Sequence, residues 1–300
     1  MQKCNQIDFI GIGAQKSGTS WLFQQFRKSS QFSLPPKKEL HFFSKDAKYP
    51  SPNMLLKRKL INRVGNPLWF HEVFMKFTKY KSQRDWFSKW YFSEYTDEWY
   101  ISLFENFTKC SGEITPAYAI LDEEDVSKMS KLIGADTKII YILRHPVDRA
   151  WSSYKFKYKL KKISDFDKEH FFKYIHSNEH QLRSDYLRTI RIYKKYFNSI
   201  CVSFFDAIED HPKSLLSHIF EYLELDTSEV KNLINAEKKI NSTQNIQLPE
   251  EIANELYAIY EDSINELAKL YGGRFNSWKR QHESQKQECK EYKPGFVIKG

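Results

Sequence analysis

The sequence IDFIGIGAQKSGTSWLFQQFRK, residues 7–28, decides the fold class. Residues 7–13 form a short run of β-branched and aromatic residues that ends in glycines, which is typical of a buried strand. Residues 19–28 then carry apolar side chains at helical spacing. The order of strand, glycine loop and helix predicts an α/β protein with an anion-binding loop between the first strand and the first helix.

The same order recurs further along the chain. Residues 138–143 (KIIYIL) predict a second buried strand, residues 144–146 (RHP) interrupt it, and residues 147–158 have helical character. Residues 200–205 (ICVSFF) predict a third strand. Buried strands separated by helices indicate a mostly parallel sheet with helices on both faces, which is a three-layer sandwich.

The composition is that of a chain with one large core. Its 300 residues are 41% hydrophobic and 16% aromatic, with a net charge of +9, which excludes a disordered chain. We predict a single domain over residues 1–278, with a helical insertion at about residues 55–107. A helix is expected over residues 249–270, and a polar, basic, mobile tail over residues 279–300.

The sequence contains no recognisable membrane or secretion signal and no metal-binding cysteine motif, and these absences decide the expected location of the protein and the redox state of its cysteines. No apolar run reaches the ~18 residues that cross a bilayer, so we expect no transmembrane segment. No secretory signal is recognisable, and the predicted location is cytoplasmic. The four cysteines lie too far apart for a metal knuckle, and we expect them to be reduced.

The glycine loop departs from two common nucleotide-binding patterns. The dinucleotide fingerprint needs glycine where the chain has Lys16, and the Walker A pattern needs lysine where it has Thr19. The loop still directs backbone N–H groups and a helix N-terminus toward one point, beside Lys16, and so predicts a site for a phosphate-like anion. A plain strand-to-helix turn is the alternative.

Four segments, in order, resemble the motifs of sulfotransferases that use 3′-phosphoadenosine 5′-phosphosulfate (PAPS). GAQKSGTSWL (residues 13–22) resembles the 5′-phosphosulfate loop, and LRHPVDRAWSSY (residues 143–154) resembles the 3′-phosphate element LRxPxxRxxSxY. KELHFF (residues 38–43) and GEITPAY (residues 112–118) resemble the KExxFF and GExTPxY elements of the heparan sulfate and bacterial carbohydrate branch. The resemblance implies a P-loop-NTPase-like fold, PAPS as donor, adenosine 3′,5′-bisphosphate as product and no required metal.

The resemblance also implies which residues hold the donor. Arg144 and Ser152 correspond to the 3′-phosphate ligands, and they flank a helix start, where anions bind. Trp21 corresponds to a tryptophan that stacks on adenine, with a core tryptophan as the alternative. Arg149 is expected to be structural or at the surface, and His145 to serve backbone geometry. The residues that correspond to the 5′ clamp are Gln15, Lys16, Ser17, Gly18, Thr19 and Ser20.

Two residues correspond to the family's catalytic groups. Lys16 would stabilise charge that develops on the bridging oxygen of the donor. Glu39 matches the general base, and its neighbours Lys37 and Lys38 favour its ionised form. An ordinary surface glutamate is the alternative for Glu39.

Contacts to the acceptor are less well defined by the resemblance. His41 is a second candidate base or a packed histidine, and Thr115 and Tyr118 are candidate acceptor contacts. The heparan 3-O branch has a reaction-centre lysine where this chain has Ile114, so the role of that lysine is vacant here. Residues 238–245 take the approximate place of the family's loop near the 3′-phosphate.

The acceptor class stays open. The KExxFF element favours a sugar hydroxyl, on a glycan or glycolipid, and a hydroxylated small metabolite is the alternative. A P-loop kinase or NTPase would need a Walker lysine and a magnesium-binding aspartate after a later strand, but Arg144 stands there. A nucleic-acid-binding protein would carry a recognisable motif, and none is present, so no nucleic-acid partner is expected. The oligomeric state is not predicted.

Overall fold

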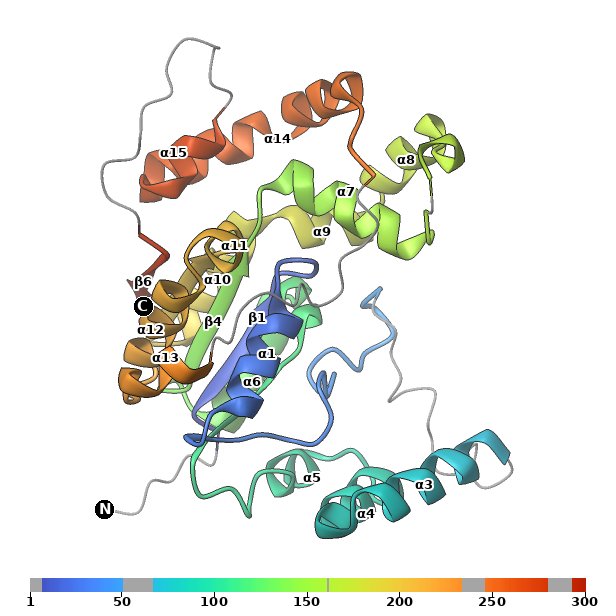
Figure 1. The fold of residues 1–300 in the computed structure, drawn as a ribbon, viewed down its shortest axis with the longest axis vertical. Helices are drawn as coiled ribbons and strands as arrows, with labels where there is room; N and C mark the ends of the chain where they lie inside the picture. The colour runs from blue at the N-terminus through green and yellow to red at the C-terminus, as the bar shows by residue number, and fades with distance from the viewer. Residues whose placement is uncertain (1–6, 51–66, 161, 234–245, 280–292) are drawn as a thin grey trace.

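A six-stranded sheet lies at the centre of the part of the chain that the structure describes (Figure 1). The structure is a computed structural model, and it describes residues 7–50, 67–160, 162–233, 246–279 and 293–300. The strand order is β2-β3-β1-β4-β5-β6. The strands are β1 (Phe9–Gly13), β2 (Phe32–Ser33), β3 (Cys110–Ile114), β4 (Lys138–Leu143), β5 (Ser199–Phe204) and β6 (Gly295–Lys299).

Five of these strands run parallel. The central strand β1 pairs with β3 on one side and with β4 on the other, and the parallel order continues to β2 and β5. Only β6 is antiparallel within this sheet, where it pairs with β5. Because the carboxyl ends of parallel strands meet at one edge, the loops after β1, β3 and β4 come together there.

Helices surround the sheet on both faces and beyond its carboxyl edge. The longer ones are α1 (Thr19–Lys28), α3 (Pro67–Lys79), α4 (Arg84–Phe92), α6 (Glu123–Ile133), α7 (Pro146–Lys157), α8 (Lys168–Ile175), α10 (Tyr186–Tyr196), α12 (Pro212–Tyr222) and α14 (Glu250–Tyr271). The shorter ones are α5 (Asp97–Ser102), α9 (Asn178–Ser184), α11 (Asp206–Asp210), α13 (Val230–Leu233) and α15 (Arg274–Trp278).

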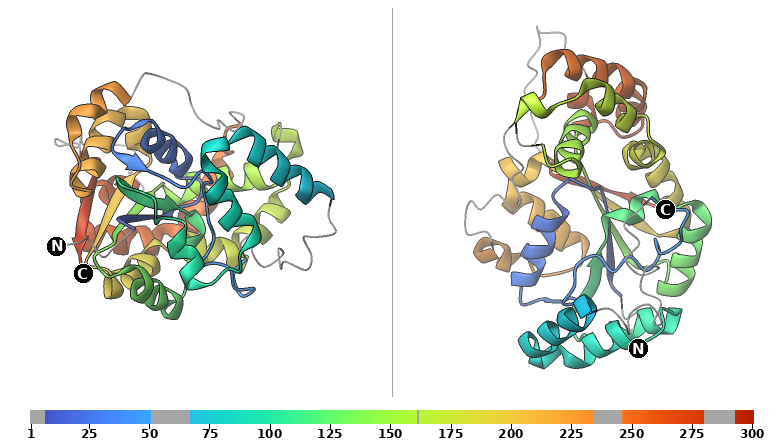
Figure 2. Two further views of the ribbon diagram at one scale, coloured as in Figure 1. Left: turned by 90° about the horizontal axis from the view of Figure 1, so that it is seen from below. Right: turned by 90° about the vertical axis from the view of Figure 1, so that its right-hand side faces the viewer.

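The alternation of side chains along the strands divides the core into two layers. In β4, Ile139, Tyr141 and Leu143 join one buried cluster, which also contains apolar residues of α6 and α10. Ile140 and Ile142 point the other way and join a second cluster with residues of α1 and α12. The views in Figure 2 show the helices on either side of the sheet. The predicted three-layer α/β sandwich with a mostly parallel sheet is therefore confirmed.

The expected tail over residues 279–300 is wrong at its end. Gly295–Lys299 forms strand β6, which covers the outer edge of β5. A side chain at position 295 would lie 2.4 Å from the Val202 carbonyl oxygen, so glycine allows this close pairing. Residues 280–292 lie outside the described residues. The five-residue strand is too short, and too distant from its partner in sequence, for a local pattern to reveal it.

The insertion between the first two strand–helix units contains the predicted helices. Helices α3, α4 and α5 lie within it, whereas residues 51–66 are outside the described residues. Strand β3 contains the first three residues of the GExTPxY element, and the sequence does not predict it because CSGEI lacks an apolar run. Gly112 in this strand allows close contact with β1, since a Cβ there would lie 2.1 Å from the Phe9 carbonyl oxygen.

Candidate active site

The loop of residues 14–18 connects β1 to α1 at the carboxyl edge of the sheet. Gly18 caps α1 with a left-handed backbone (φ 84°), and a Cβ there would lie 2.1 Å from Ile208 Cδ1. Glycine suits this left-handed position, and an added Cβ would displace the end of the Ile208 side chain on α11. The first turn of α1 has no acidic side chain and no side-chain cap, so its N–H groups face the loop without an internal anion.

One hydroxyl of the loop indicates a ligand. The Ser17 side chain is fully buried, and its Oγ has no hydrogen-bond partner among the described residues. A buried hydroxyl without a partner is costly, and an anion held by the loop amides would supply one. The loop therefore fits a phosphate-like anion, as the sequence predicts.

Lys16 stands at the tip of the loop with a left-handed backbone (φ 70°). Its Nζ lies 4.0 Å from the ring centre of Phe156, an exposed residue of α7. Burial, together with the charges of Arg144 and Lys155, lowers the pKa of Lys16 to about 8. An anionic ligand would relieve the repulsion among these cations.

Arg144 directly follows β4, and its side chain contacts the 14–18 loop. Its Nη1 donates to the carbonyl oxygen of Lys16 at 3.3 Å, and its guanidinium lies 4.3 Å from the ring centre of Phe205. Burial lowers the pKa of Arg144, and its Nε has no partner among the described residues. The structure thus brings together two groups that are 128 positions apart in the sequence.

The other predicted donor ligands lie in the 14–18 loop and on the helices that start at this edge. Gln15, Ser20 and Trp21 are partly buried near the start of α1, and Thr19 is buried at its first position. Trp21 packs against the cluster beneath α1, so one part of it belongs to the core. Ser152 lies on α7 and is nearly buried.

His145 and Arg149 have structural roles, as the sequence suggested for both. The backbone N–H of Val147 donates to His145 Nδ1, and His145 Nε2 contacts the Trp278 carbonyl oxygen at 3.2 Å. His145 therefore caps α7 and ties it to α15. Arg149 is fully buried and contacts His180 and Ser184 of α9, so the surface alternative for Arg149 is wrong.

Glu39 lies in the segment after β2, with a left-handed backbone (φ 64°) and a partly exposed side chain. It pairs with Lys38, and its Oε2 lies 3.5 Å from His41 Nε2. Burial opposes ionisation, but hydrogen bonds from His41 and Lys38 outweigh it and lower the pKa of Glu39 to about 2. Glu39 is ionised at neutral pH, as the sequence suggested, but a carboxylate with so low a pKa is a weak base.

A fully buried carboxylate, Glu113 of β3, holds the Glu39 segment in place. Its oxygens accept from the backbone N–H of Leu40 at 3.0 Å and from the hydroxyl of Tyr100 at 2.8 Å. They also accept from Thr115 Oγ1 at 2.6 Å and from the Tyr118 hydroxyl at 2.8 Å. Burial raises the pKa of Glu113, although these four donors favour the carboxylate. Sequence reasoning did not single out Glu113 from its motif.

The same network corrects two predicted acceptor contacts. Thr115 and Tyr118 are fully buried, and both hydroxyls donate to Glu113. Tyr118 also accepts from the backbone N–H of Phe42 at 3.0 Å. These residues therefore hold the Glu39 segment through Glu113 and Phe42, and neither side chain is exposed at the surface. His41 is nearly buried beside Ser44, at 3.2 Å, and contacts Glu39, which makes it a packed neighbour of the candidate base.

Ile114 occupies the position where the related branch has a lysine. Its side chain is buried in the cluster beneath α1 and would lie 2.9 Å from a Cβ on Gly11. The side chain at position 114 therefore points into the apolar core of this protein. Lys155 of α7 adds a third cation near Lys16 and Arg144. Residues 238–245 lie outside the described residues.

The described part of the chain shows neither a metal cluster nor a membrane span. No group of three His, Cys, Asp or Glu side chains there is arranged to hold a metal ion. No helix among the described residues is long and apolar enough to cross a membrane. The cytoplasmic location stays a prediction.

Comparison with known proteins identifies the family. The family model for the sulfotransferase domain matches residues 6–289, although no curated protein matches the sequence. A solved sulfotransferase from Alicyclobacillus acidocaldarius is 18% identical, with a TM-score of 0.60 over 91% of this chain and 99% of that one. The sulfotransferase domain from the curacin biosynthetic pathway is 14% identical, with a TM-score of 0.51 over 85% and 97% of the two chains. These structures share the fold. The chain belongs to the sulfotransferase domain family and is a PAPS-dependent sulfotransferase.

Proposed function

We propose that the protein transfers the sulfuryl group of PAPS to a hydroxyl group of a sugar or glycolipid. The contact between Arg144 and the Lys16 carbonyl supports the use of PAPS most directly, because it brings the residues proposed for the two ends of the donor together. The KExxFF element with Glu39 supports a sugar as the acceptor. A hydroxylated small metabolite is the alternative acceptor.

The donor would be held at both ends by residues around the carboxyl edge. At its 5′ end, the 14–18 loop and the first turn of α1 supply backbone N–H groups, with the hydroxyls of Ser17, Thr19 and Ser20 and the amide of Gln15. At its 3′ end, Arg144 and Ser152 would hold the phosphate. Trp21, which is partly exposed beside the loop, would stack on adenine.

PAPS supplies the sulfuryl group and leaves as adenosine 3′,5′-bisphosphate. Lys16 would leave the Phe156 ring and stabilise negative charge on the oxygen that is released from sulfur. Glu39 would accept the proton of the attacking hydroxyl as its oxygen bonds to sulfur. No metal ion is needed for these roles, because Lys16, Arg144 and Lys155 supply the positive charge.

Ligand binding tests the class of reaction. Adenosine 3′,5′-bisphosphate should raise the melting temperature, whereas ATP with magnesium should raise it less. The result to expect from a nucleotide kinase is the opposite order, with stabilisation by ATP and magnesium alone.

Two variants test the assigned roles. Lys16→Ala should abolish transfer and weaken binding of adenosine 3′,5′-bisphosphate, whereas Glu39→Gln should abolish transfer and leave that binding nearly unchanged. Lys28→Ala, at the other end of α1, is the control and should change neither quantity. The reverse pattern for the two variants would overturn the roles. Labelled PAPS tested against glycans, glycolipids and small metabolites would then identify the acceptor.

A further inference from the structure

Helix α3 and the end of α4 expose an apolar surface away from the site. Phe70, Phe74 and Met75 of α3 are 52%, 65% and 48% exposed, and Phe92 of α4 is 52% exposed. Phe77 lies between them in contact with Phe92, at 6.2 Å between ring centres, so the surface continues across both helices. We call the residues Phe70, Phe74, Met75 and Phe92 the α3 face. Phe70 and Phe74 are one helical turn apart, and exposed apolar side chains that neighbour one another in this way indicate an interaction site.

Basic residues of α3, of the turn after it and of α4 flank the α3 face in the sequence. Between residues 70 and 92 the sequence has five lysines and arginines but only two acidic residues, Glu72 and Asp85. Glu72 accepts a hydrogen bond from the Tyr91 hydroxyl at 2.8 Å. Lys76 lies 5.3 Å from the ring centre of Tyr80, at the end of the same helix. The face therefore combines exposed aromatic rings with a basic border.

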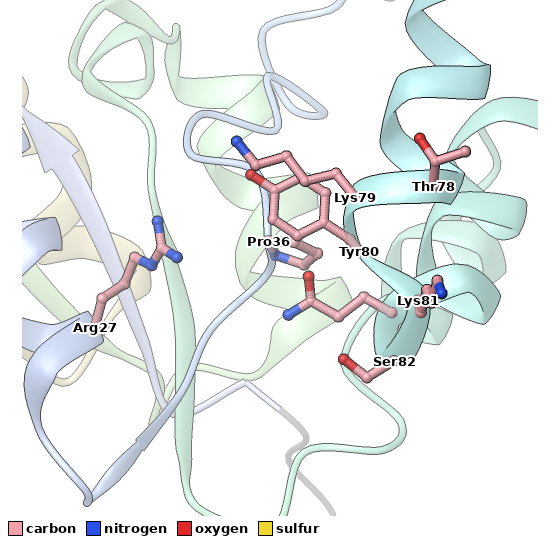
Figure 3. Close-up of a pocket in the computed structure, with 8 residues that line it drawn as sticks. Arg27, Pro36, Thr78, Lys79, Tyr80, Lys81 and Ser82 are labelled. Carbon is pink, nitrogen blue, oxygen red and sulfur yellow. The ribbon is translucent and has the colours of Figure 1, made fainter.

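The border continues into an open groove at the end of α3. This groove of about 530 Å³ is lined by Arg27, Pro36 and residues 78–83, including Lys79 and Lys81, and no carboxylate lines it. Figure 3 shows Lys79 and Tyr80 facing the groove opposite Arg27 of α1. None of the residues of the 14–18 loop lines it, so the groove is separate from the donor site.

We propose that the α3 face docks the protein onto an anionic lipid bilayer. Aromatic and apolar side chains of a surface helix enter the boundary between headgroups and acyl chains, while flanking lysines attract anionic lipids. A second copy of the chain fits less well, because it would bring an equally basic border against this one. In Figure 1, α3 projects from the body of the molecule, where a flat surface can reach it. The inference is independent of the proposed reaction.

Vesicle binding tests the proposal with the full chain. The bound fraction should be at least about tenfold higher with vesicles of phosphatidylcholine and phosphatidylglycerol than with phosphatidylcholine alone, and it should fall at high salt. Phe70→Ser combined with Phe74→Ser should lower binding to the anionic vesicles about tenfold. Leu270→Ser is the matched control, because Leu270 of α14 is also 52% exposed but lies outside the α3 face.

Three outcomes would overturn the proposal. One is equal binding to neutral and anionic vesicles, or no binding to either. Another is an equal loss of binding in the Leu270→Ser control. A third is a dimer in light scattering that the Phe70→Ser and Phe74→Ser changes dissociate, which would assign the face to a second copy. Donor binding and transfer to a water-soluble acceptor, measured on the same variants, should be unchanged, so this test and that of the reaction can fail separately.

Discussion

The substitution Glu113→Gln tests whether the buried carboxylate positions the candidate base. The glutamine side chain keeps the size of Glu113 but offers one acceptor oxygen, and its NH2 group must face two of the four donors. The hydroxyls of Tyr100 and Tyr118 can rotate to accept, but the backbone N–H of Leu40 can only donate. With the NH2 group toward the two tyrosines, charge-assisted bonds of about 1.5–3 kcal/mol each become weaker neutral bonds, while removal of a buried charge offsets part of this cost. We expect the free energy of unfolding to fall by about 3 kcal/mol.

The same substitution should slow the reaction more than it weakens donor binding. Leu40 directly follows Glu39, so a shift of its backbone by about 1 Å would lower kcat on the order of 100-fold. The KM for the donor should change little, because the 14–18 loop is held by separate contacts. Thermal unfolding should show a melting temperature lower by roughly 5 °C. Steady-state kinetics and calorimetry measure both effects.

A matched control and a clear contrary result make this test decisive. Glu123→Gln removes an exposed carboxylate that pairs with Lys195 and should leave both quantities nearly unchanged. A Glu113→Gln variant with wild-type kcat and melting temperature would refute the positioning role. A lowered melting temperature with wild-type kcat would reduce Glu113 to a purely structural residue.

Two further predictions concern the 14–18 loop. Because burial and neighbouring cations lower the pKa of Lys16 to about 8, while a bound phosphate favours its charged form, affinity for adenosine 3′,5′-bisphosphate should fall as pH rises above about 8. Titration calorimetry in buffers of different ionisation enthalpy should then show proton uptake on binding. The affinity of the Lys16→Arg variant should depend less on pH. A wild-type affinity that does not change with pH would contradict the placement of Lys16 beside the bound phosphate. Gly18→Ala should lower the free energy of unfolding by about 2 kcal/mol and weaken donor binding at least about tenfold, because its Cβ would lie 2.1 Å from Ile208 Cδ1. Gly273→Ala is the control in denaturant unfolding, since its φ is also positive (52°) but nothing lies within 4 Å of the added carbon, and an equal loss in both variants would exclude the clash.

The parts of the fold that were predicted from sequence are those fixed by local patterns. The predicted helix over residues 19–28 and the strand over residues 138–143 agree with α1 and β4 in their bounds. Each has a continuous pattern with a glycine or proline close to one end, which limits the alternatives. The contact of Arg144 with the 14–18 loop follows from parallel strands, because β1 and β4 are neighbours that end at the same edge.

The parts that were missed depend on contacts between distant segments. Nothing in GFVIK, residues 295–299, indicates a partner, and β6 exists because β5 offers an open edge. In the sequence, Glu113 is a single acidic residue in a short motif. Only the packing of β3 against the Glu39 segment shows that four groups donate hydrogen bonds to its carboxylate. Phe156 likewise lies in a run of lysines and aromatics, and its contact with Lys16 arises from the position of α7.

Lys16 lies among other cations, whereas the charge of Glu39 is already paired, and this difference suggests an order in which donor and acceptor bind. Lys16 is crowded by Arg144 and Lys155, so an anionic donor lowers the free energy of this group as soon as it binds. Glu39 is already paired with Lys38 and has a pKa of about 2, so it has little tendency to take a proton. An acceptor hydroxyl that displaces Lys38 would remove a donor from Glu39 and raise its pKa toward the range of an effective base. We therefore expect the donor to bind first and Glu39 to become basic only when an acceptor is in place.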